Sequence, residues 1–245
     1  MKYLILKIEF DGTDFCGWQI QPKDRSVQEE IQNALYALFK REVKVIGAGR
    51  TDSGVHAREM TASARIDFEI TIPSDKIDKA INSKLNKDVF VKSAVLSNDK
   101  FHARFDAKYR SYKYYINTIP TPINRRYSTL WQYPFDEELL FRTAEIFICE
   151  TNFTTFSKIN NDTKNHVCNV MESKWEKIGD GQYVFSIKAN RFLYGMVRSL
   201  VGAMLEVARG YRDIEDVKEA LFAIDRSRGS ALAPAYGLFF EKAGY

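Results

Sequence analysis

Residues 60–96, MTASARIDFEITIPSDKIDKAINSKLNKDVFVKSAVL, change their apolar spacing twice, and these changes decide the fold. Alternate residues are apolar from 60 to 70, which is typical of a half-buried strand. Pro73 and Ser74 then introduce a helix with apolar residues at helical intervals, and residues 89–96 return to an extended pattern. This stretch therefore predicts a strand, a helix and a second strand.

The residues before this stretch supply a strand, a helix and another strand. Residues 3–10 alternate apolar and polar side chains, which is typical of a strand. Ser26 and Glu29 have the spacing of a capping box at the start of an amphipathic helix that continues to Lys40, and residues 43–46 predict a short strand. The first half therefore has the order β-α-β-β-α-β, which defines the split βαβ or ferredoxin-like unit.

The second half repeats this order of elements without repeating residue identities. Its predicted elements are a strand at 108–117, a helix at 136–149, strands at 170–175 and 183–189, helices at 192–207 and 213–223, and an extended segment at 237–241. Residues 157–164 are polar and are expected to form a mobile insertion. We therefore predict an α+β fold of two ferredoxin-like halves that share an antiparallel sheet, with an N-terminal domain at residues 1–104 and a C-terminal domain at residues 105–245.

The composition is that of a folded protein without a membrane anchor. The 245 residues are 45% hydrophobic and 28% charged, and no stretch approaches the roughly 20 apolar residues that a bilayer crossing needs. Cys16, Cys149 and Cys168 form no CxxC pair, and His166 beside Cys168 makes a poor zinc site. We therefore expect a soluble, cytoplasmic protein from a reducing compartment, with no bound metal.

Basic and aromatic residues concentrate between residues 100 and 126. The net charge is only +4, but this segment holds seven lysines and arginines against the single acid Asp106, interleaved with six aromatic residues. Cations pair with phosphates and aromatic rings stack on bases, so the segment favours RNA as the partner. Arg104, Arg110 and Lys113 are the candidate RNA-binding residues within it.

The glycine-rich segment 47–57, GAGRTDSGVHA, is the densest candidate for a functional loop. Its glycines allow a close backbone approach, but their spacing fits neither the Walker pattern nor the dinucleotide fingerprint of phosphate loops. Two interpretations stay open. In the structural one, Asp52 caps a turn, Arg50 pairs with it and His56 is a satisfied loop residue. In the functional one, an ionised Asp52 faces a substrate from a recess.

Two further segments combine charge with apolar or aromatic residues. In residues 191–206, RFLYGMVRSLVGAMLE, the apolar positions form one face of a helix, and Arg198 among them would need a carboxylate partner. In residues 101–116, FHARFDAKYRSYKYYI, Tyr112 and Tyr114 fall on one face of a strand, where one ring could stack on a base. A core helix and a half-buried, tyrosine-rich strand are the structural alternatives.

These three segments, together with FDGTDFCGWQIQ at residues 10–21, resemble the TruA family of tRNA pseudouridine synthases in order, spacing and identity. The resemblance spans nearly the whole chain. It implies two α/β halves around a shared sheet with a basic central cleft, and a homodimer in which tRNA touches both subunits. It also implies isomerisation of uridine to pseudouridine in the anticodon stem-loop, typically at positions 38–40, without a metal or organic cofactor.

The resemblance also implies roles for five residues. Asp52 would be the nucleophile, which attacks the base at C6 or the sugar at C1′, or assists a glycal route. Tyr112 would stack on the target uracil, and Val197 would wall the uracil pocket. Arg198 would be the ion-pair partner of Asp52, and Arg50 would contact RNA beside the flipped nucleotide.

Two departures from the family pattern and two alternative functions stay open. Residues 166–170, HVCNV, lack an arginine that many members carry there, and the end GLFFEKAGY varies the usual pattern, which leaves open a specialised paralogue. A non-catalytic tRNA-binding module would be free to lose Asp52 and its predicted partners, but all are present. A carboxylate-dependent hydrolase of sugars would need a second acid opposite Asp52, whereas Asp11 and Asp14 lie in a turn suited to local hydrogen bonding.

Overall fold

The computed structural model describes residues 1–158 and 163–245, which divide into two compact units. The first unit comprises residues 1–110 with the C-terminal residues 239–245, and the second comprises residues 111–238. Part of the predicted polar insertion falls on the four remaining residues and lies outside the described residues. The predicted domain boundary between residues 104 and 105 stays a prediction.

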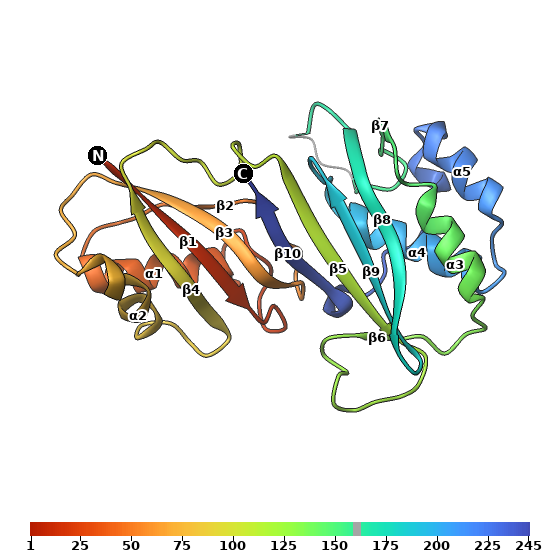
Figure 1. The fold of residues 1–245 in the computed structure, drawn as a ribbon, viewed down its shortest axis with the longest axis horizontal. Coiled ribbons are helices and arrows are strands. Elements are labelled where there is room, and N and C mark those ends of the chain that lie inside the picture. The colour runs from red at the N-terminus through yellow and green to blue at the C-terminus, as the bar shows by residue number, and fades with distance from the viewer. Residues whose placement is uncertain (159–162) are drawn as a thin grey trace. The chain divides into compact units, whose positions relative to one another are not determined.

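The first unit has the predicted order of elements (Figure 1). They are β1 (Lys2–Phe10), α1 (Val27–Phe39), β2 (Val45–Gly47), β3 (His56–Ile66), a 3-10 turn (Ser74–Lys76), α2 (Ile77–Asn82) and β4 (Val89–Ser97). β1 pairs antiparallel with β3 and β4, and β2 pairs antiparallel with β3. β10 (Leu238–Gly244), from the end of the chain, pairs parallel with β3. The split βαβ order predicted for this half is confirmed.

Strand β3 begins and ends four residues earlier than predicted. His56 and Ala57 are part of the strand because they pair with Phe239 and Phe240 of β10. Phe68 lies beyond the end of the strand, and its ring packs against that of Phe39, with 5.5 Å between the ring centroids. Both differences come from contacts distant in sequence, which local periodicity does not report.

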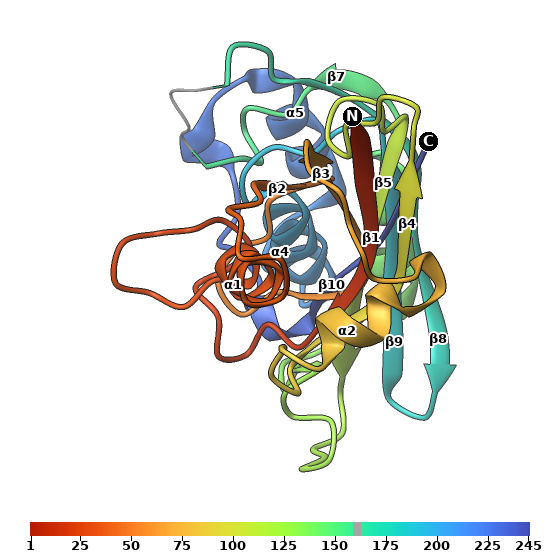
Figure 2. The same cartoon turned by 90° about the vertical axis from the view of Figure 1, so that its left-hand side faces the viewer.

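The apolar face of β1 forms the core of the first unit together with the two helices. Leu4, Leu6 and Ile8 are fully buried, as the alternation predicted. Helices α1 and α2 lie on the same face of this sheet (Figure 2). The predicted cap of α1 is confirmed, because the backbone N–H of Glu29 donates to Oγ of Ser26 at 3.4 Å. Each such aliphatic side chain contributes roughly 1.5–3 kcal/mol by its burial.

The loop 101–107, which carries the predicted RNA-binding residue Arg104, packs on the opposite face of β3. Ser63 is buried on this face, and the backbone N–H of Ala103 donates to its Oγ at 3.0 Å. The hydroxyl of Tyr245 donates to the carbonyl of Ala103 at 2.8 Å. Burial raises the pKa of Tyr245 to about 12. These contacts fix the loop to the first unit.

The second unit is built around four strands, in the spatial order β5 (Tyr109–Asn117), β9 (Gln182–Ala189), β8 (Val167–Gly179) and β7 (Glu150–Asn152). β8 is antiparallel to β7 and β9, whereas β6 pairs parallel with β5, and α3 packs against α4 and β8. β6 and β7 were not predicted; the other elements follow the predicted order. The chain therefore has an α+β fold with mixed, mostly antiparallel strand pairing. The elements are β5 (Tyr109–Asn117), β6 (Thr129–Leu130), α3 (Glu137–Glu145), β7 (Glu150–Asn152), β8 (Val167–Gly179), β9 (Gln182–Ala189), α4 (Met196–Ala208), α5 (Ile214–Ala223) and 3-10 turns at Arg226–Arg228 and Ala235–Gly237.

Two helices of this unit are shorter than predicted. Helix α4 begins at Met196 and not at Phe192, because Gly195 directly before it has φ of +69°. This left-handed conformation interrupts the helical path upstream. Helix α3 ends at Glu145 and not at Cys149, and irregular backbone follows before β7.

The described residues include neither a helix suited to span a membrane nor a cluster suited to bind a metal, and their cysteines are unbridged. No helix among them is long and apolar enough to cross a membrane. No group of three or more His, Cys, Asp or Glu side chains among them could hold a metal ion. All three cysteines, which lie in the described ranges, are free thiols.

Candidate active site

The loop between β2 and β3 holds Asp52 against the segment that follows β1. The backbone N–H of Trp18 donates to the carbonyl of Thr51 at 3.2 Å. On the other side, the N–H of Gly54 donates to the carbonyl of Phe15 at 3.3 Å. Asp52 is half-buried between these two hydrogen bonds. The backbone around its carboxylate is therefore held from both sides.

Two glycines of the segment after β1 allow this close approach. A Cβ on Gly12 would lie 2.0 Å from the carbonyl oxygen of Val55, and a Cβ on Gly17 would lie 2.4 Å from that of Thr51. Gly17 also has φ of +113°, which side-chain-bearing residues rarely adopt. The close approach was predicted for the glycines of segment 47–57, whereas the tightest contacts involve Gly12 and Gly17 of the segment after β1. Any side chain at these two positions would displace the loop.

In the structural interpretation of this loop, the internal hydrogen bond of His56 is confirmed, although His56 is the first residue of β3, and the pairing of Arg50 with Asp52 is wrong. His56 is buried, and its Nδ1 accepts a hydrogen bond from the N–H of Gly12 at 3.0 Å. Oδ1 of Asp11 lies 3.1 Å from the same ring nitrogen, so both Gly12 and Asp11 contact this edge of the imidazole. Arg50 is exposed and makes no hydrogen bond or ion pair with any described residue, so it does not pair with Asp52.

In the second unit, Val197 and Arg198 lie in the first turn of α4. Nε of Arg198 donates to the carbonyl of Ala233 at 2.7 Å, and the N–H of Ala233 donates back to the carbonyl of Arg198 at 3.0 Å. Val197 is buried. Tyr112 of β5 is also buried, and its ring meets that of Phe192 edge-on, with 5.0 Å between the centroids. The hydrogen bond from Nε orients the Arg198 side chain, and the backbone hydrogen bond fixes Ala233 beside it.

Tyr114 follows Tyr112 on the same face of β5 and is fully buried. Its hydroxyl lies 2.6 Å from Oγ1 of Thr129 and donates to the carbonyl of Pro234 at 2.9 Å. Burial raises the pKa of Tyr114, while the hydrogen bond with Thr129 and the charge of Arg198 act in the opposite direction. Tyr114 therefore serves packing and internal hydrogen bonding, which leaves Tyr112 as the stacking candidate of this strand.

The three predicted RNA-binding residues have different environments. The guanidinium of Arg110 donates to the carbonyls of Ala48 (3.1 Å), Ala107 (3.0 Å) and Arg104. Arg110 therefore ties two loops of the first unit together. The side chain of Arg104 is exposed, and Lys113 is half-buried on β5. Contact of these three residues with RNA stays a prediction.

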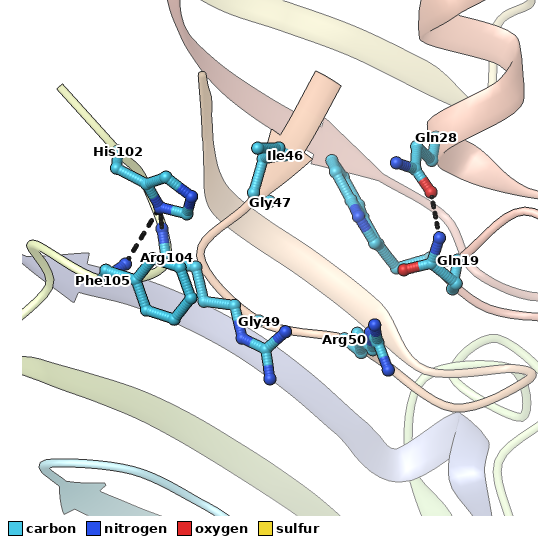
Figure 3. A pocket seen from close by; sticks show the side chains of 10 residues that line it. Gln19, Gln28, Ile46, Gly47, Gly49, Arg50, His102, Arg104 and Phe105 are labelled. Carbon is cyan, nitrogen blue, oxygen red and sulfur yellow. Dashed lines mark hydrogen bonds between the residues drawn. The ribbon is translucent and has the colours of Figure 1, made fainter. Parts of the chain in front are cut away.

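A pocket of about 290 Å³ lies in the first unit, next to the loop that carries Asp52 (Figure 3). Ten residues line it, and we name it the Phe105 pocket: Trp18, Gln19, Gln28, Ile46, Gly47, Gly49, Arg50, His102, Arg104 and Phe105. His102 at its edge holds the loop in shape, because its Nδ1 accepts from the N–H groups of Arg104 (3.2 Å) and Phe105 (3.1 Å). The sequence indicated Arg50 and Arg104 as RNA contacts, counted Phe105 among the aromatic residues of the basic segment and placed Trp18 and Gln19 in the motif at residues 10–21, but it did not predict that these side chains line one pocket.

The candidate residues divide between the two units. Arg50 and Asp52 belong to the first, and Tyr112, Val197 and Arg198 belong to the second. The structure brings the first pair together in one loop and the last two in one helical turn. That all five surround one substrate is a proposal.

The family of the chain follows from comparison with known proteins. Residues 7–106 and 144–245 match the tRNA pseudouridine synthase family. The chain is 37% identical to tRNA pseudouridine synthase A of Bacteroides fragilis, over 100% of this chain and 96% of that relative. It is 38% identical to tRNA pseudouridine synthase A of Bacteroides thetaiotaomicron, over 100% of this chain and 91% of that relative. Because these matches span nearly all of both chains, this protein belongs to the TruA-type tRNA pseudouridine synthase A family, whose members are isomerases.

Proposed function

We propose that this enzyme converts uridine to pseudouridine in the anticodon stem-loop of tRNAs, at positions 38–40, with Asp52 as the nucleophile. The observation that carries the proposal is the loop geometry, in which Asp52 is half-buried and its backbone is hydrogen-bonded on both sides. A carboxylate on a backbone held in this way needs little movement of the main chain when the substrate arrives. In the reaction the C1′–N1 bond breaks and a C1′–C5 bond forms, while C5 loses a proton and N1 gains one, so no cofactor is required.

In this proposal, residues of the second unit surround the flipped uracil. Tyr112 stacks on the base and Val197 walls its pocket. Arg198 pairs with Asp52, and the hydrogen bond of its Nε within the second unit supports this role because it orients the side chain. Arg50 contacts the RNA beside the flipped nucleotide, which agrees with its exposure and with its lack of a partner among the described residues. These contacts offset the few kcal/mol that extrusion of the base costs.

The proposal extends to the RNA interface and the assembly. The two halves share one sheet with a basic central cleft, in which Arg104, Arg110 and Lys113 bind tRNA phosphates. Two copies of the chain form a homodimer in the cytoplasm, and tRNA touches both. Sedimentation equilibrium tests the assembly, since a homodimer has about twice the 28.3 kDa mass of one chain. A mass near 28.3 kDa at micromolar concentrations would contradict it.

Tritium release from tRNA that carries C5-labelled uridine tests the reaction and the role of Asp52. Asp52→Asn is expected to lower the release rate by a factor on the order of 10⁴ while tRNA binding is retained. Asp14→Asn is the matched control, because Asp14 is exposed and has no hydrogen bond or ion pair with a described residue. Chemical mapping of the modified RNA then locates the pseudouridines. Equal release by wild type and Asp52→Asn would contradict the nucleophile, and tight tRNA binding without release by any variant would favour a binding module.

A further inference from the structure

Phe105 is exposed although its loop is ordered. It exposes 76% of its surface, and its ring stacks on His102 with 4.3 Å between the centroids. The loop is closed by two hydrogen bonds, from the N–H of His102 to Oδ2 of Asp106 (2.8 Å) and from the N–H of Asp106 to the carbonyl of His102 (3.0 Å). An aromatic ring held in this way gains little from folding, but it offers a flat surface on which a nucleobase can stack.

A fixed amide lies on the other side of the pocket (Figure 3). Oε1 of Gln28 accepts from Nε2 of Gln19 at 2.8 Å and from the N–H of Ile20 at 3.2 Å, and Nε2 of Gln28 donates to the carbonyl of Val45 at 2.7 Å. Gln28 therefore sets the orientation of the Gln19 amide. Oε1 of Gln19 accepts no hydrogen bond from a described residue. An oriented amide with an unused oxygen suits the polar edge of an unpaired base.

The charge and size of the Phe105 pocket favour a single nucleotide. Arg50 and Arg104 both line it, and no aspartate or glutamate in the described part of the chain does. Arginine binds phosphate through its planar fork of donors. The volume of about 290 Å³ is close to the lower end of ligand pockets, which is enough for one base.

We propose that the Phe105 pocket binds a second nucleotide of the tRNA, a close neighbour of the target uridine. Its base stacks on Phe105 and meets the Gln19 amide, and its phosphate is held by Arg50 and Arg104. Arg50 is two residues from Asp52, which limits their separation along the chain to roughly 7 Å. A nucleotide held here therefore positions its neighbour at Asp52. This inference rests on the proposed action on the anticodon stem-loop and adds a subsite that the isomerisation chemistry itself does not require.

The test compares wild type with Phe105→Ala and with Phe90→Ala. Phe90 is a matched control, because it is an exposed ring (54%) on β4 that does not line the pocket. Dissociation constants are measured at fixed salt for an anticodon stem-loop and for versions in which one loop nucleotide at a time is abasic. Phe105→Ala is expected to raise Kd about tenfold, as the loss of one stacked base does, and Phe90→Ala to leave it unchanged. At one loop position, removal of the base is expected to weaken binding by wild type to the level that Phe105→Ala shows with the intact RNA. The same removal is expected to weaken binding by Phe105→Ala no further.

Arg104→Gln separates stacking from phosphate binding. It is expected to reduce the slope of log Kd against log salt by about 0.7–0.9, whereas Phe105→Ala leaves the slope unchanged. Equal Kd values for wild type and Phe105→Ala would overturn the inference. So would a loss of affinity from Phe105→Ala that adds in full to the loss from base removal at every abasic position. So would tight binding of a free nucleoside monophosphate that Phe105→Ala abolishes without any change in RNA affinity.

Tritium release by wild type is measured in parallel, so that failure of the proposed function can be distinguished from failure of the second subsite. An absence of release from wild type would refute the proposed function. Release by wild type together with unchanged RNA binding by Phe105→Ala would refute the second subsite alone.

Discussion

Removing the hydroxyl of Tyr114 is expected to destabilise the protein. The hydroxyl is buried and has one proton, so it donates to the carbonyl of Pro234 at 2.9 Å and accepts from Thr129 at 2.6 Å. In Tyr114→Phe, Thr129 and Pro234 each lose their hydrogen bond to the phenol. Water has little room to replace the hydroxyl, because the ring is closely packed: a Cβ on Gly237 would lie 2.8 Å from Cζ of the ring. Two hydrogen bonds of about 1 kcal/mol each lower the free energy of unfolding by about 2 kcal/mol. For a chain of this size, Tm should fall by about 4–8 °C.

The assay is thermal unfolding of wild type, Tyr114→Phe and Tyr236→Phe, followed by circular dichroism. Tyr236 is the matched control, because it is 38% exposed and its hydroxyl makes no hydrogen bond to a described residue. Its replacement should change Tm by less than about 2 °C. Equal Tm values for the two phenylalanine variants at pH 7 would refute the reasoning.

The pH dependence of this difference gives a second check. Burial raises the pKa of Tyr114 in the folded protein above its unfolded value of about 10, so the folded state keeps a proton that the unfolded state gives up. The stabilisation by the phenol is therefore complete below about pH 10 and is lost as the pH rises toward the folded pKa. The Tm difference between wild type and Tyr114→Phe should shrink above about pH 10, and a difference that widened there would contradict this assignment.

Two further predictions concern the loop after β1 and the thiols. In Gly12→Ala the new Cβ would lie 2.0 Å from the carbonyl oxygen of Val55. We therefore expect the free energy of unfolding to fall by about 1–3 kcal/mol, measured as a lower Tm, and tritium release to become slower. An unchanged Tm would show that the backbone shifts freely. Burial raises the pKa of Cys168 to about 11. In a Cys16→Ser/Cys149→Ser variant, the remaining thiol should therefore react with a disulfide reagent at pH 8 only after denaturation. Rapid labelling of the native protein would contradict the burial of Cys168.

Sequence patterns were most successful where the signal is local. The alternation in residues 3–10 predicted the buried face of β1, and the Ser26 cap predicted the start of α1. The boundaries failed where backbone conformation or distant pairing decides them. Helix α4 starts four residues late because Gly195 is left-handed, and β3 starts at His56 because β10 pairs with it there. Neither a single dihedral angle nor a partner strand is visible in apolar periodicity.

For the site, motifs named the residues but not their environments. Arg50 and Asp52 stood out as a pair within one loop, yet the structure shows no ion pair between them and gives His56 an internal hydrogen bond. Arg110 stood out as an RNA-binding cation, and three backbone carbonyls of its own unit accept from it. Residue type indicates which chemistry is available, whereas the use of that chemistry depends on neighbours distant in sequence.

The sequence by itself determined the order of the elements and the family resemblance, because periodicity and motif spacing are properties of short segments, and the resemblance in turn implied Asp52 as the candidate nucleophile. Only the tertiary structure decided that glycines of the segment after β1 carry the tightest contacts of the Asp52 loop. It alone assembled the Phe105 pocket from Trp18, Gln19, Arg50 and the loop after β4. The physical reason is that a pocket is made by chain segments far apart in sequence, and their meeting is set by packing and long-range pairing, which no local pattern encodes.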